Sequence, residues 1–90
     1  MRYMVIENYT QGPEAVYRRF AAKGRLAPAG LAYLDSWVDV GGTRCFQLME
    51  CDDPALLEQW IAAWADLVDF EVVPVIGSAD AAGRFAPKST

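Results

Sequence analysis

The residues best suited to chemistry are four carboxylates in strand-like stretches of the sequence, Glu7, Asp35, Glu50 and Glu71. A carboxyl group in an apolar cavity has a raised pKa, because burial penalises its charged form, and it can then act as a general acid or base. The more ordinary interpretation is that these acids form hydrogen bonds or ion pairs at a sheet edge or an interface. Among them we select Asp35 as the candidate catalytic base, because Trp37, two residues further on, can stack on a flat ligand. A lone strand tryptophan is also typical of a core or interface, so both interpretations of Trp37 stay open.

Other residue types exclude several kinds of site. The chain has no histidine, which excludes Ser-His-Asp and Cys-His catalysis, axial-histidine haem and histidine-ligated zinc. Cys45 and Cys51 are six residues apart in one strand-like run, about 20 Å when extended, whereas disulfide-bonded Cα atoms lie within about 7 Å. We therefore expect two buried thiols in a reducing cytoplasm. Asp52-Asp53 is interpreted as a helix cap, and the sequence predicts neither a metal site nor a cofactor.

Length and composition limit the class of protein. The 90 residues are 53% hydrophobic with a net charge of −4, which is typical of one folded domain over residues 1–90 and excludes disorder. No apolar run approaches the roughly 18–20 residues of a membrane span. The acidic balance argues against binding to nucleic acid or to an anionic membrane. A chain this short buries a small core, so its eleven aromatic rings (three Trp, four Tyr, four Phe) favour self-association.

The hydrophobic periodicity alternates between strand and helix. Strands are expected over residues 3–9, 31–40, 43–51 and 70–76, with the last in the interior of the sheet because its apolar run is nearly continuous. Helices are expected from Pro13 to Gly24 and from Pro54 to about Val68, and after about residue 77 a short helix from Ser78 leads into a frayed tail. The order β-α-β-β-α-β predicts an α+β fold of the ferredoxin-like kind, a four-stranded antiparallel sheet with two helices on one face.

Alternation along the strands predicts what each sheet face holds. We expect the face toward the helices to carry Met4, Ile6, Leu34, Val38, Phe46 and Leu48. The opposite face then shows Tyr3, Val5, Glu7, Tyr33, Asp35, Trp37, Cys45, Gln47 and Met49, a mixture suited to a dimer core with a pocket. From this set the candidate ligand-binding residues are Tyr3, Glu7, Tyr33, Trp37 and Gln47.

The turn at Gly41-Gly42 decides where Trp37 lies. A strict two-residue loop pairs Trp37 with Phe46 and moves Trp37 to the face of Phe46 and Leu48. A three-residue loop or a bulge keeps Trp37 on the polar face. We favour the bulged turn, because it leaves the more apolar face toward the helices.

Four stretches carry a resemblance to a known family: Asp35-Ser36-Trp37, Cys45-Phe46-Gln47-Leu48-Met49-Glu50, Trp60-Ile61-Ala62-Ala63-Trp64 and Asp69-Phe70-Glu71-Val72-Val73-Pro74-Val75. With them the chain resembles a family of short bacterial proteins, catalogued as a domain of unknown function, in the dimeric α/β-barrel superfamily. The resemblance implies that two sheets pack face to face in a homodimer. Asn8 and a helix tryptophan are similar to residues of the haem-degrading and antibiotic-biosynthesis monooxygenases of that superfamily. Without the haem-ligating histidine, the similarity implies cofactor-free chemistry.

Three functional hypotheses follow, and whether the protein is an enzyme stays open among them. The first is a cytoplasmic homodimer that binds a small apolar or aromatic molecule inside the barrel, with no assignable reaction. The second is a cofactor-independent monooxygenase or isomerase acting on a small aromatic substrate, with Asp35 as the base and Trp37 orienting the ring. The third is a purely structural dimer whose barrel is filled by side chains.

Overall fold

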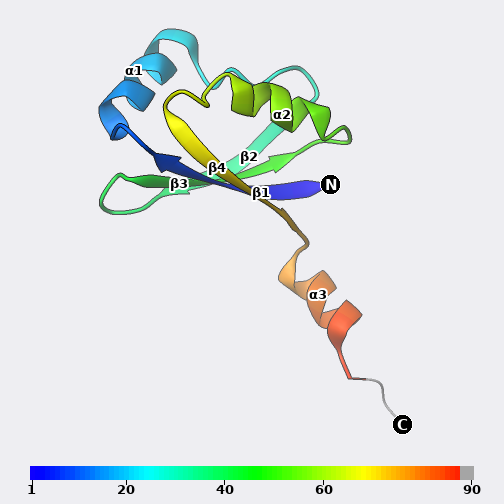
Figure 1. Cartoon of the computed structure of the whole chain (residues 1–90). Coiled ribbons are helices and arrows are strands. Elements are labelled where there is room, and N and C mark those ends of the chain that lie inside the picture. The colour runs from blue at the N-terminus through cyan, green and yellow to red at the C-terminus, as the bar shows by residue number, and fades with distance from the viewer. Residues whose placement is uncertain (88–90) are drawn as a thin grey trace.

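The computed structural model describes residues 1–87 (Figure 1). Its elements, in chain order, are β1 (Arg2–Tyr9), α1 (Pro13–Lys23), β2 (Ala32–Val38), β3 (Arg44–Glu50), α2 (Ala55–Ala62), β4 (Val68–Val75) and α3 (Ser78–Phe85). The tail that the sequence analysis expected to fray extends into residues 88–90, which lie outside the described residues.

The four strands form one antiparallel sheet in the order β2-β3-β1-β4. Helices α1 and α2 lie on the same face of this sheet (Figure 1). These features confirm the α+β class and the antiparallel four-stranded sheet. The interior position predicted for β4 is wrong, because β4 is an edge strand. An edge position also suits Pro74, since a proline has no N–H to donate to a neighbouring strand.

Local sequence explains where the helices begin and end. Pro13 occupies the first turn of α1, and Gly24, with φ of 71°, ends that helix by donating its N–H to the Phe20 carbonyl. Asp53 Oδ1 accepts a hydrogen bond of 3.0 Å from the Ala55 N–H at the start of α2. This second helix is shorter than predicted, because the chain turns after Ala62 and enters β4 at Val68.

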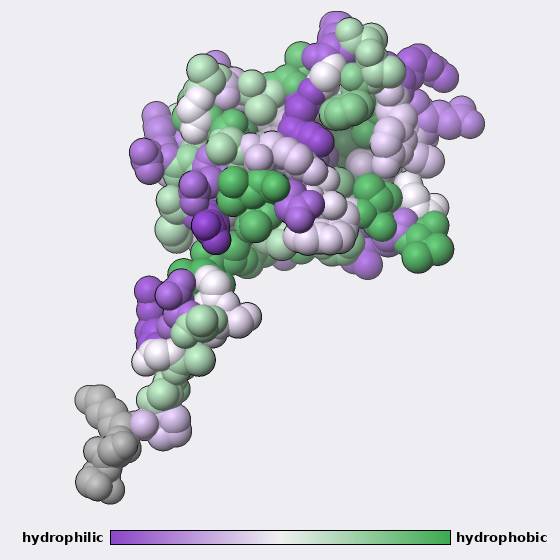
Figure 2. All heavy atoms as spheres, turned by 180° about the vertical axis from the view of Figure 1, so that it is seen from behind, coloured by the Kyte–Doolittle hydropathy of each residue, from purple (hydrophilic) through white to green (hydrophobic). Residues whose placement is uncertain are grey.

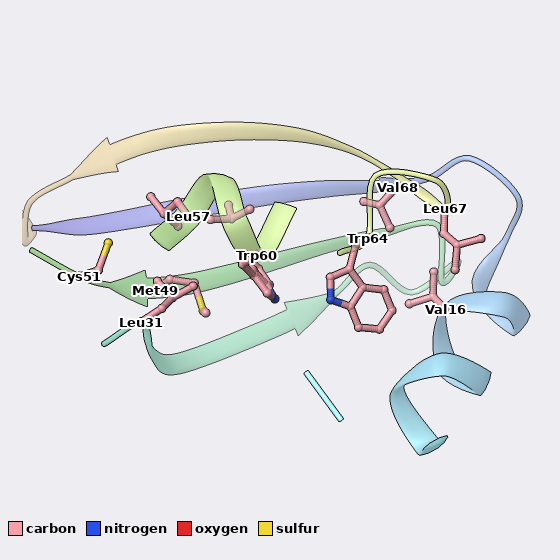
Figure 3. Close-up of a cluster of buried hydrophobic side chains, with 10 residues drawn as sticks. Val16, Leu31, Met49, Cys51, Leu57, Trp60, Trp64, Leu67 and Val68 are labelled. Atoms are coloured by element: carbon pink, nitrogen blue, oxygen red, sulfur yellow. The ribbon is translucent and has the colours of Figure 1, made fainter. Parts of the chain in front are cut away.

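The hydrophobic core lies between the sheet and α1 and α2. Val5 of β1 and Met49 of β3 are fully buried, and Trp60 of α2 is 1% exposed. Trp64, in the turn after α2, lies beside Trp60 over the sheet (Figure 3). The large side chains of this core therefore come from α2 and its following turn, and the strands contribute the floor beneath them.

The two faces are the reverse of those predicted for β1 and β3, whereas Asp35, Trp37 and Val38 of β2 lie on their predicted sides of the sheet. Tyr3, Val5, Glu7, Cys45, Gln47 and Met49 point to the helix side, where all but Tyr3 are buried. Met4, Ile6, Phe46 and Leu48 lie on the face without helices and are partly buried. Both sets of residues alternate equally well, so the period of two does not decide which set meets the helices. In the structure Trp60 and Trp64 belong to the same core cluster as Val5 and Met49.

The hairpin between β2 and β3 has the strand pairing expected for a strict two-residue loop. The bulged turn that we favoured from the sequence is therefore wrong. Asp39 donates its N–H to the Arg44 carbonyl at 3.0 Å, and Trp37 pairs with Phe46. The Asp39 carboxylate holds this turn by accepting hydrogen bonds from the backbone N–H groups of Thr43 and Arg44, at 2.7 and 2.9 Å. These bonds also keep the pKa of Asp39 below its usual value.

A bulge does occur in β2, between Tyr33 and Asp35. It shifts the alternation by one residue. Tyr33 consequently pairs with Met49 on the helix side, whereas Asp35 pairs with Leu48 on the opposite face.

Helix α3 stands away from the body on the side of the sheet opposite to α1 and α2 (Figures 1 and 2). It has no buried residue within Ser78–Phe85, and Phe85 is 74% exposed. Among residues 1–87, no helix has the length and apolar character needed to cross a membrane.

Candidate functional site

A cavity of about 120 Å³ lies between the helix side of the sheet and α1. Its walls come from β1, α1, the loop after α1, β2, β3, α2 and the turn after α2: Glu7, Tyr9, Val16, Tyr17, Phe20, Arg25, Ser36, Val38, Cys45, Gln47, Trp60 and Trp64. Seven of these twelve residues are aliphatic or aromatic: Tyr9, Val16, Tyr17, Phe20, Val38, Trp60 and Trp64. The other five are Glu7, Ser36, Cys45 and Gln47 of the sheet and Arg25 of the loop after α1. An apolar enclosure with a few converging polar groups is the usual form of a small-molecule site.

Glu7 and Gln47 form the polar floor of this cavity. They project from the neighbouring central strands β1 and β3, and they are only 4% and 8% exposed. Gln47 Nε2 donates a hydrogen bond to Glu7 Oε2. Gln47 Oε1 is buried and has no hydrogen-bond partner within residues 1–87. The amide is thus held on one side by Glu7 and has an acceptor free on the other.

Burial controls the protonation of the floor. It raises the pKa of Glu7, although hydrogen bonds from Gln47 and Cys45 and the charge of Arg25 act in the opposite direction. Burial and the Glu7 charge raise the pKa of the Cys45 thiol to about 11. Burial also raises the pKa of Tyr9, and the nearby Cys45 and Glu7 act in the same direction. Of these four side chains, Glu7 and Gln47 are joined by a hydrogen bond between β1 and β3.

Arg25 supplies the cation of the site from the loop after α1. Its guanidinium lies 3.7 Å from the ring centroid of Tyr33 and 5.2 Å from that of Phe20. Such stacking on aromatic faces is favourable for arginine and restricts its movement. Arg25 Nε is buried, and no residue in the described part of the chain accepts its hydrogen bond.

The backbone of Arg25 is fixed as firmly as its side chain. Its carbonyl accepts hydrogen bonds from the indole N–H groups of Trp60 and Trp64, at 3.0 and 2.9 Å. Leu26, the next residue, has φ of 63°, a conformation rare for residues other than glycine. Strained backbone of this kind persists where the surrounding contacts hold it, and it is concentrated at functional sites.

The structure brings together some of the predicted site residues and separates others. Glu7 and Gln47 line the cavity. Tyr33 lies beside it, under Arg25, and its hydroxyl hydrogen-bonds Ser36 Oγ at 2.6 Å. Tyr3 also faces the helix side, where it packs against the core rather than lining the cavity.

Asp35 and Trp37 lie on the opposite face of the sheet. Both are exposed, Trp37 at 52%, and Asp35 Oδ1 accepts a hydrogen bond from the Ser36 N–H. The prediction that they share one face with Glu7 and Gln47 is therefore wrong. The hairpin register and the bulge place Asp35 and Trp37 on the face without helices, whereas Glu7 and Gln47 face the helices. Asn8, which carried the similarity to monooxygenases, is exposed and pairs with Arg44 and Asp69 on the same distant face.

Sequence analysis did not name Arg25 or Tyr9 as candidate site residues, and it used Trp60 and Trp64 only as part of the family resemblance. Tyr9 shares the alternation of Glu7 and could have been found from it. Arg25 follows the helix-ending Gly24, and its orientation depends on two indoles some 35 to 39 residues away. No local pattern signals such a contact.

A family described as a domain of unknown function, DUF3303, matches residues 1–89 of the chain. The chain belongs to this family. The match agrees with the sequence-based resemblance to a domain of unknown function. No curated protein and no solved structure matches the DUF3303 chain. The case for its function consequently rests on the geometry of the cavity.

Proposed function

We propose that the chain binds a small planar molecule in the cavity between its sheet and α1. The observation that carries this proposal is the convergence of Glu7, Gln47 and Arg25 on a partly open cavity with aromatic walls. Ligand sites in proteins combine mostly apolar walls with a few polar groups that fix orientation. The proposed site therefore lies on the helix side of one subunit, and not between two sheets as expected from the sequence.

The size and walls of the cavity favour one aromatic ring. Its volume of about 120 Å³ is close to the roughly 150 Å³ of an engineered apolar cavity that holds benzene. Trp60, Trp64, Phe20 and Tyr17 offer ring faces and edges for stacking. A ligand of about six to ten non-hydrogen atoms suits these dimensions.

A second candidate function is proton transfer on a small aromatic substrate, as in a cofactor-independent isomerase or monooxygenase. The raised pKa of buried Glu7 favours it, because a carboxyl tuned toward neutral pH is an effective acid or base. In an isomerisation, Glu7 would take a proton from carbon next to a carbonyl, and Arg25 would stabilise the negative charge that develops on the oxygen. Return of the proton to a different carbon would complete the reaction. In this proposal Glu7 replaces Asp35 as the base.

The uncovered sheet face supports a homodimer of ferredoxin-like subunits. Partly exposed apolar side chains share this face: Met4, Ile6, Trp37, Phe46, Leu48 and Val73. A second copy packed about 10 Å away, sheet to sheet, would bury them. The strand order β2-β3-β1-β4 fits this assignment to the dimeric α/β-barrel superfamily. An origin in the bacterial cytoplasm stays a prediction from the sequence.

Titration with phenol tests the binding site. We expect backbone amide shifts in ¹H–¹⁵N spectra at residues lining the cavity, and loss of these shifts in Val16→Trp, which fills it. Val72→Trp is the matched control, because Val72 is 37% exposed and does not line the cavity. Phenol binding that survives in Val16→Trp, or shifts confined to other surfaces, would contradict the proposed site.

Sedimentation equilibrium tests the dimer. We expect twice the chain mass at micromolar concentration, and the mass of a single chain for Leu48→Lys, which places a charge on the uncovered face. Val40→Lys is the control, since Val40 is fully exposed at the hairpin. A native chain that sediments as a monomer at this concentration excludes the dimer.

A further inference from the structure

We propose that the ligand of the cavity carries a hydrogen-bond donor and a hydrogen-bond acceptor on its ring, as in an aromatic primary amide or a phenol. The inference rests on the proposed function, and it names the chemical class of the ligand. Two buried side-chain atoms of opposite hydrogen-bonding character, Gln47 Oε1 and Arg25 Nε, carry it.

Gln47 requires a donor from the ligand. Its Nε2 is engaged by Glu7, so the free Oε1 can only accept a hydrogen bond. The side chain is 8% exposed and lies on the cavity floor. A buried polar atom without a partner is costly, so a ligand that donates a hydrogen bond to this oxygen gains affinity.

Arg25 requires an acceptor from the ligand. A guanidinium has donors only, and Arg25, which lines the cavity, has a buried Nε without a partner among residues 1–87. Stacking on Tyr33 and Phe20 fixes the plane of the group, so Nε cannot readily turn toward solvent. A carbonyl or hydroxyl oxygen on the ligand would accept this hydrogen bond.

These two requirements disfavour the simplest alternatives. A plain aromatic hydrocarbon leaves both Gln47 Oε1 and Arg25 Nε without partners. An aromatic carboxylate satisfies Arg25 but has no proton to donate to Gln47, and it places a second acid beside buried Glu7. A primary amide directs its carbonyl to Arg25 and its N–H to Gln47, and a phenol hydroxyl can serve both.

Four ring compounds of similar size separate these possibilities: benzamide, phenol, toluene and benzoate. Titrated into the full chain at pH 7 and followed by ¹H–¹⁵N spectra, benzamide or phenol should bind at least about tenfold more tightly than toluene and benzoate. Gln47→Met should remove most of this preference, whereas Gln11→Met, on the surface, should preserve it. The comparison of compounds on the native chain stands even if Gln47→Met does not fold.

The outcomes distinguish this inference from the proposed function. Toluene or benzoate binding as tightly as the better of benzamide and phenol overturns the donor and acceptor requirement but leaves the cavity as a binding site. Binding by none of the four compounds overturns both.

Discussion

Replacement of Glu7 by glutamine is the most direct test of the cavity's electrostatics. Glu7→Gln keeps the size of the side chain and its ability to hydrogen-bond Gln47, but it removes the titrating proton. Burial raises the pKa of Glu7 in the folded chain above the ordinary glutamate value of 4.5, which we take for the unfolded chain. The folded state therefore holds this proton more tightly than the unfolded state.

The sign of the effect follows from that difference. Below the unfolded pKa, Glu7 is protonated in both states and imposes no ionisation cost. As pH rises toward the folded pKa, the unfolded state releases the proton first, so the stability contributed by Glu7 falls. Each unit by which burial raises this pKa corresponds to about 1.4 kcal/mol of lost stability above the folded pKa.

The assay is urea unfolding followed by circular dichroism at several pH values from about 4 to 8. We expect Glu7→Gln to gain stability relative to the native chain across this interval, by about 1.4 kcal/mol for each unit of pKa elevation. Glu71→Gln is the matched control, because Glu71 is an exposed glutamate of the same sheet. A difference between Glu7→Gln and the native chain that stays constant with pH would refute the raised pKa.

Three further predictions concern packing and reactivity. Trp60→Phe should lower the free energy of unfolding by about 2–3 kcal/mol in urea titrations, because it removes buried volume and the indole hydrogen bond to the loop after α1; an unchanged midpoint would contradict this packing. Gly30→Ala should destabilise the fold by about 1–3 kcal/mol, measured by thermal unfolding, because φ at Gly30 is +94° and a Cβ would lie 3.0 Å from Leu56 Cδ1. Gly41→Ala is the control and should have little effect, because there is open space around Gly41. Alkylation of Cys45 by iodoacetamide, measured by mass spectrometry at pH 7.5, should be about 100-fold slower in the folded than in the urea-unfolded chain, because its pKa is raised from 9.0 to about 11; equal rates would exclude its burial.

The element order could be predicted from the sequence because its signals are local. Pro13 and Gly24 bound α1, and the Gly41-Gly42 pair marks the hairpin. These residues set the local backbone conformation by their own preferences, without contacts to distant residues. The interior position of β4 was predicted wrongly because it depends on neighbouring strands. An apolar run indicates that a strand is buried, but an edge strand can also be apolar.

The faces of the sheet could not be predicted, because they depend on contacts between distant residues. The bulge between Tyr33 and Asp35 reverses the alternation within β2, and nothing in those two residues marks the extra position. Glu7 and Gln47 were correctly expected to share a face, because both strands keep a strict period of two, but the face is the one toward the helices. Arg25 was not predicted, because its position depends on hydrogen bonds from the distant indole N–H groups of Trp60 and Trp64 to its carbonyl.

The shared carbonyl of Arg25 has a consequence for how a small molecule would enter. It joins the loop after α1 to Trp60 and Trp64, so this wall can open only by breaking two hydrogen bonds at once. Tyr17 and Phe20 on the α1 side are 48% and 43% exposed, which makes them the easier gate. Rotations of exposed side chains take picoseconds to nanoseconds, so the barrier to entry and exit would be low and complexes in this cavity would be short-lived.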